Sequence, residues 1–478
     1  SSIKVHLMFE DKSISEIISL IQSKKVSVKE VVEFYLERIK KYNPTLNAIV
    51  LQRDEQKILD EANSIDKKGI DKNKPLIGLP MACKDLFDIE GFPSTYGYLD
   101  FKNNIAKKNS IIVDRLKKSG AIIIGKTNTA ELGIGGHTTN RLFGPTSNPY
   151  NISKSAAGSS GGAGAAVAAG LLPFADGTDM MGSCRAPAAY ANIYGFRPTT
   201  GLIPTDRSNE KRLDNFPVLT TPGCFAKTPQ DMSILLDCIV GKDSTDPLSI
   251  SLNSSFKDNL NNKTNFSNLR VCWLSDLNGG YNFENGIIEM CENQLKNLNN
   301  YKLAIEPLKS DITSNDLWES WNILRAKSIF DDIVSMKIDD INKMTQQAIW
   351  EYEKGKKIKK EDIDRALKQK ISCQNEIEKL FEKYDFLILP SAQVFPFDKN
   401  LQYPNKINEK KLDTYHRWIE VFIMSSLLDL PTITVPVGFN EDGLPMGMQI
   451  VAKKFNDLKL LAFAKQYEEC FNFSKIKP

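Results

Sequence analysis

The alternation of apolar and polar residues predicts that the chain begins with two amphipathic helices. Isoleucines recur at helical spacing over 14–21, and a second apolar stripe of the same period covers 28–39. We expect Pro44 to end the second helix, because proline cannot continue the helical hydrogen-bond ladder. Each helix is preceded by a serine and a glutamate with the spacing of a capping box, namely Ser13 with Glu16 and Ser27 with Glu30.

From about residue 75 the pattern changes to alternating helices and strands. Residues 110–120 have helical periodicity with a glycine stop, and the β-branched run at 121–128 predicts a buried strand. Residues 163–172 are small and apolar on all sides, which is typical of a buried helix. This order predicts an α/β fold with a central mixed, mostly parallel β-sheet covered by helices on both faces. The later part of the chain also combines both kinds of element: we expect strands at 269–275, 386–395 and 431–439, and mainly helices at 285–383.

Composition and charge exclude several classes of protein. Lys+Arg 62 nearly balance Asp+Glu 59, so the net charge of +3 gives no electrostatic reason to expect a nucleic acid or an anionic membrane as partner. No stretch approaches the roughly 20 apolar residues of a membrane span, and the first residues contain no apolar leader. The eight cysteines form no CxxC pair and the three histidines have no clustered partners. We therefore expect reduced thiols, no metal site and a cytoplasmic protein.

Two segments rich in small residues carry the candidate chemistry, AAGSSGGAGAAVAAG at 156–170 and DGTDMMGSCRAPAA at 176–189. A phosphate-binding loop would need a lysine after the glycines, and none follows. A serine-esterase elbow is matched literally by GSSGG, with Ser160 as the central serine and His416 as the downstream histidine, although no apolar strand precedes it. A third interpretation makes the two segments halves of one catalytic site.

A lysine can activate a serine if the lysine is neutral. Free lysine has a pKa near 10.4, so a base that works at pH 7 needs a shift of about three units, and burial supplies up to about 3–5. Lys84 is the candidate, because it ends the apolar run LPMAC, whereas most other lysines stand in polar segments.

Long stretches of the chain are similar, in order, to the amidase signature enzymes. The resemblance rests on GLPMACKDLFDIEGFPSTYG, GKTNTAELGIGGHTTNRLFGPTSNPYN, the whole segment 156–201 and the late GLPMGMQIVA, and it covers nearly the whole chain. Lys84, Ser159 and Ser183 lie 75 and 24 positions apart (159−84 and 183−159), which fits the Ser–cis-Ser–Lys triad of that family.

The resemblance implies an architecture and a set of roles. It implies one large α/β/α domain over 1–478, with a signature catalytic core at 75–240, a helical pocket-forming region at 285–383 and assembly as a homodimer. Ser183 becomes the nucleophile, Ser159 the bridging serine after a cis peptide bond, and Lys84 the base. Such a mechanism hydrolyses a small-molecule amide and requires neither a metal nor an organic cofactor. The amides expected to face the oxyanion are those of Met180, Met181, Gly182 and Ser183.

Supporting residues and departures from the family pattern complete the predicted site. Ser160 either hydrogen-bonds Lys84 or the loop, or caps the helix that follows it. Asp179 and Arg185 are expected to pair and hold the turn around the nucleophile. Met181 stands where glycine is common, so it carries strain if its φ is positive and otherwise shapes the pocket or only fills space in the core. Arg197 stands where lysine is usual, which we interpret as a minor change.

Substrate choice is expected to come from the variable regions 318–350 and 391–424. A rival function is the glutamine-hydrolysing subunit of a tRNA-dependent amidotransferase, which shares the fold and the triad. Ala186, where that subunit has glutamine, argues against it. His137 is expected near the site with its role open. The predicted pocket residues are Trp318, Trp321, Gln393, Phe395, Tyr415, His416 and Trp418.

Overall fold

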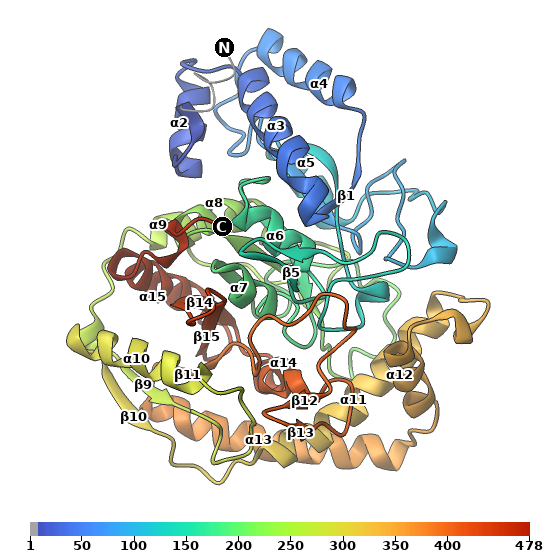
Figure 1. Ribbon diagram of the computed structural model, residues 1–478, viewed down its shortest axis with the longest axis vertical. Helices are drawn as coiled ribbons and strands as arrows, with labels where there is room; N and C mark the ends of the chain where they lie inside the picture. The colour runs from blue at the N-terminus through green and yellow to red at the C-terminus, as the bar shows by residue number, and fades with distance from the viewer. Residues whose placement is uncertain (1–7) are drawn as a thin grey trace.

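The computed structural model describes residues 8–478 and shows an α/β fold built on a mixed eight-stranded sheet, with a separate three-stranded sheet near the N-terminal helices (Figure 1). The strand order of the large sheet is β10-β9-β11-β15-β14-β7-β8-β6. In that order its strands are Ala304–Pro307, Arg270–Trp273, Phe386–Pro390, Pro445–Ala452, Thr432–Phe439, Tyr194–Arg197, Thr221–Ala226 and Ala175–Asp179. The predicted α/β class with a mixed sheet is confirmed.

Neighbouring strands of the large sheet are mainly antiparallel, so the expected predominance of parallel pairs is wrong. The pairs β10–β9 and β9–β11 run parallel, whereas every pair from β11 to β6 runs antiparallel. Strands β14 and β15 are joined by a short turn at 440–444, and a connection of that length permits only antiparallel pairing. Hydrophobic periodicity identifies a buried strand but carries no information on its direction.

The N-terminal part of the chain (blue in Figure 1) contains helices α2 to α5 and the small sheet, whose order is β1-β3-β2. Both predicted capping boxes are present. Pro44 does not end α3, which continues to Leu46 because the amide of Asn47 still donates to the carbonyl of Asn43 at 2.7 Å. The bounds are α2 Ile14–Gln22, α3 Val28–Leu46, α4 Glu55–Lys68, α5 Ile111–Lys118, β1 Ile49–Gln52, β2 Pro80–Lys84 and β3 Ile122–Thr127.

The remaining helices lie on and around the large sheet, with α11, α12 and α13 grouped on the side away from the N-terminal helices (Figure 1). Strand β10 interrupts the region 285–383, which was expected to be mainly helical. The helices are α6 Gly161–Ala168, α7 Ala186–Ala191, α8 Pro229–Ile239, α9 Phe256–Asn259, α10 Ile287–Asn300, α11 Ser314–Ser335, α12 Gln346–Lys356, α13 Lys360–Lys383, α14 Ile423–Leu428 and α15 Asp457–Cys470. The short strands are β4 Ser147–Asn148, β5 Asn151–Ser155, β12 Lys406–Ile407 and β13 Lys410–Lys411.

Helix α6 is buried along its whole length, as its small apolar residues predicted. Small side chains let neighbouring backbones approach closely: a Cβ on Gly162 would lie 2.3 Å from the backbone nitrogen of Asn128. The helix begins directly after the serine pair, so its tight packing fixes the backbone that carries those serines. Among residues 8–478, no helix is both long and apolar enough to cross a bilayer.

Candidate active site

Lys84 is the last residue of β2, and its side chain is completely buried. The strand is apolar, so it packs in the interior and brings the lysine there. The backbone amide of Lys84 donates to the carboxylate of Asp176 on β6 at 2.8 Å. This bond joins the small sheet to the edge of the large one at the residue from which the lysine side chain extends.

The three residues singled out by spacing come together in the structure. Lys84 Nζ lies 2.7 Å from Ser159 Oγ, and Ser159 Oγ lies 3.0 Å from Ser183 Oγ. The backbone amide of Ser159 also donates to Ser183 Oγ at 3.0 Å, which fixes that oxygen from a second direction. The peptide bond between Gly158 and Ser159 is cis, as the family resemblance implied.

Burial lowers the pKa of Lys84 from 10.5 to about 7, although the carboxylates of Asp179 and Asp176 act in the opposite direction. An amine with this pKa is neutral in a large fraction of molecules at neutral pH and can then accept a proton. The expected electrostatic environment of the lysine is therefore present.

Two further hydroxyls surround Lys84 Nζ, those of Ser160 and Thr178, each at 2.7 Å. Ser160 donates its own proton to the carbonyl of Thr178 at 3.2 Å, so toward Lys84 it can only accept. Ser160 stands at the N-cap position of α6, but its side chain makes no capping hydrogen bond, so the capping alternative is wrong. Thr178 was missed in the sequence, where a lone threonine inside a small-residue turn carried no signal.

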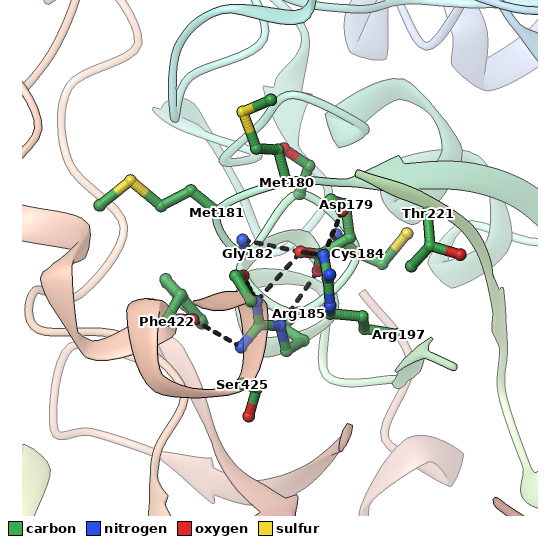
Figure 2. A network of polar contacts seen from close by, with 12 residues as sticks. Asp179, Met180, Met181, Gly182, Cys184, Arg185, Arg197, Thr221, Phe422 and Ser425 are labelled. Atoms are coloured by element: carbon green, nitrogen blue, oxygen red, sulfur yellow. Dashed lines mark hydrogen bonds and ion pairs between the residues drawn. The ribbon is translucent and has the colours of Figure 1, made fainter. Parts of the chain in front are cut away.

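The turn that carries Ser183 is organised by one buried carboxylate, that of Asp179 (Figure 2). The carboxylate accepts from the amides of Gly182 and Cys184 at 3.0 and 3.1 Å. Arg185 donates to both of its oxygens at 3.0 Å, so the expected pairing of these two residues is present. Burial alone would raise the pKa of Asp179, but Arg185 and Arg197 outweigh it and hold that pKa well below its usual range.

Arg197 is a second cation on Asp179, and its importance was missed in the sequence. Its guanidinium donates to the Asp179 carboxylate at 3.2 Å and also to the Asp179 carbonyl. The side chain is fully buried and comes from β7, two strands away from β6. The contact depends on the strand order, which the sequence does not show. Because Arg197 donates to Asp179 at two places, the arginine at this position is more than a minor change.

The predicted oxyanion donors need one correction. The amide of Gly182 already donates to Asp179, so it does not belong with the free donors. Within residues 8–478 the amides of Met180, Met181 and Ser183 make no hydrogen bond and remain available. Met181 has no positive φ, so the strain considered for it is absent, whereas Gly182 has a φ of 96°.

Comparisons with known proteins agree with this geometry. A family model described as Amidase matches residues 30–461. The chain belongs to the amidase family. An acylamidase of Rhodococcus erythropolis is 32% identical over 98% of this chain and 97% of its own length. A glutamyl-tRNA(Gln) amidotransferase subunit of Saccharolobus solfataricus is 28% identical over 97% of both chains.

A solved structure supports the same assignment. The crystal structure of a bacterial aryl acylamidase, an amidase signature enzyme, matches with a TM-score of 0.88 at 25% identity, over 97% of both chains. The resemblance and the fold class drawn from the sequence are thereby confirmed, and this chain is an amide-hydrolysing enzyme.

In this amidase Ser183 opens onto a cavity of about 930 Å³. Its side chain is the most accessible of the three, with a residue exposure of 9% against 1% for Ser159 and 0% for Lys84. The wall near the catalytic turn is largely apolar, while the segment 204–222 contributes charged residues. Apolar lining residues include Tyr96, Leu132, Ile134, Met180, Ile329 and Met336.

The aromatic residues predicted to line the pocket of the amidase do not line this cavity. Three of them are buried against one another instead: His416 stacks between Trp318 and Tyr415, with ring centroids 4.7 and 4.5 Å apart. An aromatic-rich stretch signals burial but not which cavity it faces, which is why the prediction failed. None of the seven lines the cavity, and all are buried: Trp318, Trp321, Gln393, Phe395, Tyr415, His416 and Trp418.

Two neighbours on α11 support the turn that carries Ser183 in the amidase from behind. Trp321 Nε1 donates to Met181 Sδ at 3.3 Å, and Arg325 donates to Met180 Sδ at 3.0 Å. The Met181 side chain therefore anchors the turn against α11, while Met180 lines the cavity.

Neither buried histidine of the amidase makes a hydrogen bond with Ser159, Ser160 or Ser183. His416 contacts Asn322 at 2.7 Å, and Ser160 contacts Lys84 and Thr178, so the serine-esterase interpretation lacks its serine–histidine pair. His137 Nε2 lies 2.7 Å from the carbonyl of Lys399 and must donate to it, so its Nδ1 accepts from Ser155 Oγ at 2.5 Å. His137 thus holds the backbone before Gly158, which answers the question left open about its role.

Proposed function

We propose that this amidase is an acylamidase that cleaves small-molecule amides through Ser183, Ser159 and Lys84. The observation that carries the proposal is the unbroken contact from a buried amine through Ser159 to a hydroxyl on the cavity wall, with successive distances of 2.7 and 3.0 Å. Each distance is short enough for a proton to pass along a hydrogen bond.

The first half of the reaction forms an acyl-enzyme. Ser183 Oγ attacks the amide carbonyl carbon while its proton passes to Ser159 Oγ, and the proton of Ser159 passes to Lys84 Nζ. The carbonyl oxygen becomes an oxyanion that the free amides of Met181 and Ser183 stabilise, each worth about 3–4 kcal/mol in the transition state. The C–N bond then breaks as the relay returns the proton to the leaving nitrogen.

The second half releases the acid. Water enters after the amine has left and attacks the acyl carbon, losing its proton to the same relay. The bond from Ser183 Oγ to the acyl carbon breaks, and Ser183 recovers its proton. The site supplies proton transfer and an oxyanion pocket from its own side chains and backbone, so no step needs a metal or an organic cofactor.

The test is a panel of anilides and aliphatic amides of varied acyl size, with glutamine included. We expect anilides or acyl amides to be hydrolysed and glutamine to be a poor substrate, in keeping with Ala186 after Arg185. Ser183→Ala should abolish both turnover and the acyl-enzyme mass shift, while His416→Asn should retain turnover. Efficient hydrolysis of glutamine alone would instead favour the function of an amidotransferase component, which the 28% identical relative has by name.

Three further attributes belong to the same proposal. The eight cysteines are free thiols, seven of them distant in sequence from the nucleophile, which fits a reducing cytoplasm. The family resemblance favours a homodimer. The whole chain is proposed to form one domain, with the catalytic core at 75–240 and the helical region at 285–383 beside it.

A further inference from the structure

Arg207 lines the same cavity as Ser183 and has spare hydrogen-bonding capacity. Its exposure is 8%, yet its side chain donates no hydrogen bond within residues 8–478; Nη1 is buried, whereas Nε and Nη2 are not among the buried unpaired atoms. Among the described residues its one ion pair joins Nη1 to Asp246 Oδ2 at 3.5 Å. A guanidinium carries five N–H donors, and leaving them unpaired in a buried place costs free energy.

Asp246 does not saturate Arg207, because it meets only Nη1 and leaves Nε and Nη2 unpaired in the described part of the chain. One of its oxygens accepts the amide of Thr205 at 3.0 Å, and the other accepts the amide of Leu248 at 3.0 Å. Asp246 therefore holds the backbone turn that carries Arg207, and it supplies a counter-charge at one nitrogen of the guanidinium, Nη1.

The other two arginines in the cavity wall are fully engaged. Arg212 pairs with Glu210 at 2.9 Å and with Asp331 at 2.8 Å. Arg325 contacts Glu351 at 3.3 Å and Tyr415 at 3.2 Å, in addition to its bond to Met180. Arg207 is thus the guanidinium of this wall whose Nε and Nη2 donors are left for a molecule inside the cavity.

We propose that Arg207 binds a carboxylate of the substrate, so that the preferred substrates are amides bearing a carboxylate apart from the scissile bond. The proposal rests on the proposed function and narrows its substrate class. A guanidinium and a carboxylate form a bidentate pair with two parallel hydrogen bonds, and partial burial strengthens that pair. The carboxylate can sit on the acyl half or on the amine half, and the experiment separates the two.

The experiment compares nearly isosteric charged and neutral substrates. Succinyl and isohexanoyl para-nitroanilides place the carboxylate or its isopropyl equivalent on the acyl half, and acetylated para-aminobenzoate and para-isopropylaniline place them on the amine half. In one of the two pairs we expect the wild type to favour the carboxylate by about tenfold or more in kcat/KM. Arg207→Met should reduce that ratio about tenfold to hundredfold, mainly through KM.

Two matched variants isolate the cause. Lys211→Met removes a charge from an exposed position on the same cavity wall and should change the ratio by less than about twofold. Arg207→Lys keeps the positive charge but cannot make the bidentate pair. Its preference for the carboxylate substrate, as a ratio of kcat/KM, should therefore lie between those of the wild type and Arg207→Met. If thermal melting shows that Arg207→Met does not fold, the Arg207→Lys comparison decides.

The proposal is overturned if neither pair shows a preference in the wild type, or if the Arg207 variants keep the wild-type ratio. Should the wild type hydrolyse none of the four amides, the proposed function has failed for these compounds, and binding still tests Arg207. Calorimetric titration of Ser183→Ala with the same amides, with and without Arg207→Lys, then gives affinities without turnover. Equal affinities for charged and neutral members reject the carboxylate site.

Discussion

Ser160 accepts a hydrogen bond from Lys84 Nζ at 2.7 Å while its own proton is directed to the carbonyl of Thr178 at 3.2 Å. One N–H of the amine is therefore committed to Ser160. The second N–H and the lone pair of the neutral amine are then left for Thr178 and Ser159. Ser160 thus orients the nitrogen lone pair but does not itself carry the proton.

Ser160→Ala is expected to lower kcat by about tenfold to a hundredfold, because the amine loses the contact that orients it toward Ser159. The low-pH limb of the rate profile should also move to lower pH, since the charged amine loses an acceptor. Both effects are measured from pH–rate profiles. Thr178→Ser, which keeps the second hydroxyl, is the control. If the low-pH limb of the rate profile stays at the same pH in Ser160→Ala, Ser160 has a packing role only.

The rate should depend on pH through Lys84, whose pKa is lowered to about 7 by burial. The base must be neutral, so kcat/KM should rise about tenfold per pH unit below this value and level off above it. Asp176→Asn should shift the limb to lower pH, because its carboxylate favours the charged amine. A profile that is flat from pH 5 to 8 would contradict a lysine base.

Asp179→Asn should destabilise the protein by about 3–5 kcal/mol, because it leaves Arg185 and Arg197 buried without their counter-charge. Urea unfolding measures the loss. Arg197→Lys, which restores the residue usual in the family and keeps a charge, should cost clearly less. A loss below about 1 kcal/mol in Asp179→Asn would mean that the network contributes little to folding.

Gly182→Ala should be strongly destabilising and inactive. The φ of 96° disfavours any side chain, and a Cβ would lie 2.4 Å from the ring of Phe422, so we expect a loss of at least about 2 kcal/mol. Gly443→Ala is a matched control, because Gly443 has a φ of 75° and no atom within 4 Å of the added Cβ. Similar losses in the two variants, compared by thermal melting, would show that the contact with Phe422 is tolerated.

The sequence was sufficient for features that depend on local chemistry. The two capping boxes, the helix at 111–118 and the buried helix α6 follow from neighbouring residues, and the structure has all of them. The closeness of Lys84, Ser159 and Ser183 was also predicted, because the spacing of the motifs matched those of a known family.

Features that depend on distant parts of the chain could not be predicted. The antiparallel direction of most sheet pairs, the contact of Arg197 with Asp179 and the isolation of Arg207 all depend on which segments become neighbours. The aromatic residues from Trp318 to Trp418 are buried together, but their apolar character could not tell whether they face the substrate cavity or pack behind it.

The unequal accessibility of Ser159 and Ser183, the two serines of the proposed relay, has a practical consequence. An electrophile that enters from the cavity meets the 9% exposed Ser183, while Ser159 is shielded behind it at 1%. A phosphonylating reagent that reacts once per competent molecule would therefore stop at a single covalent adduct. The burst of leaving group would count the functional molecules in a preparation directly, before any natural substrate has been identified.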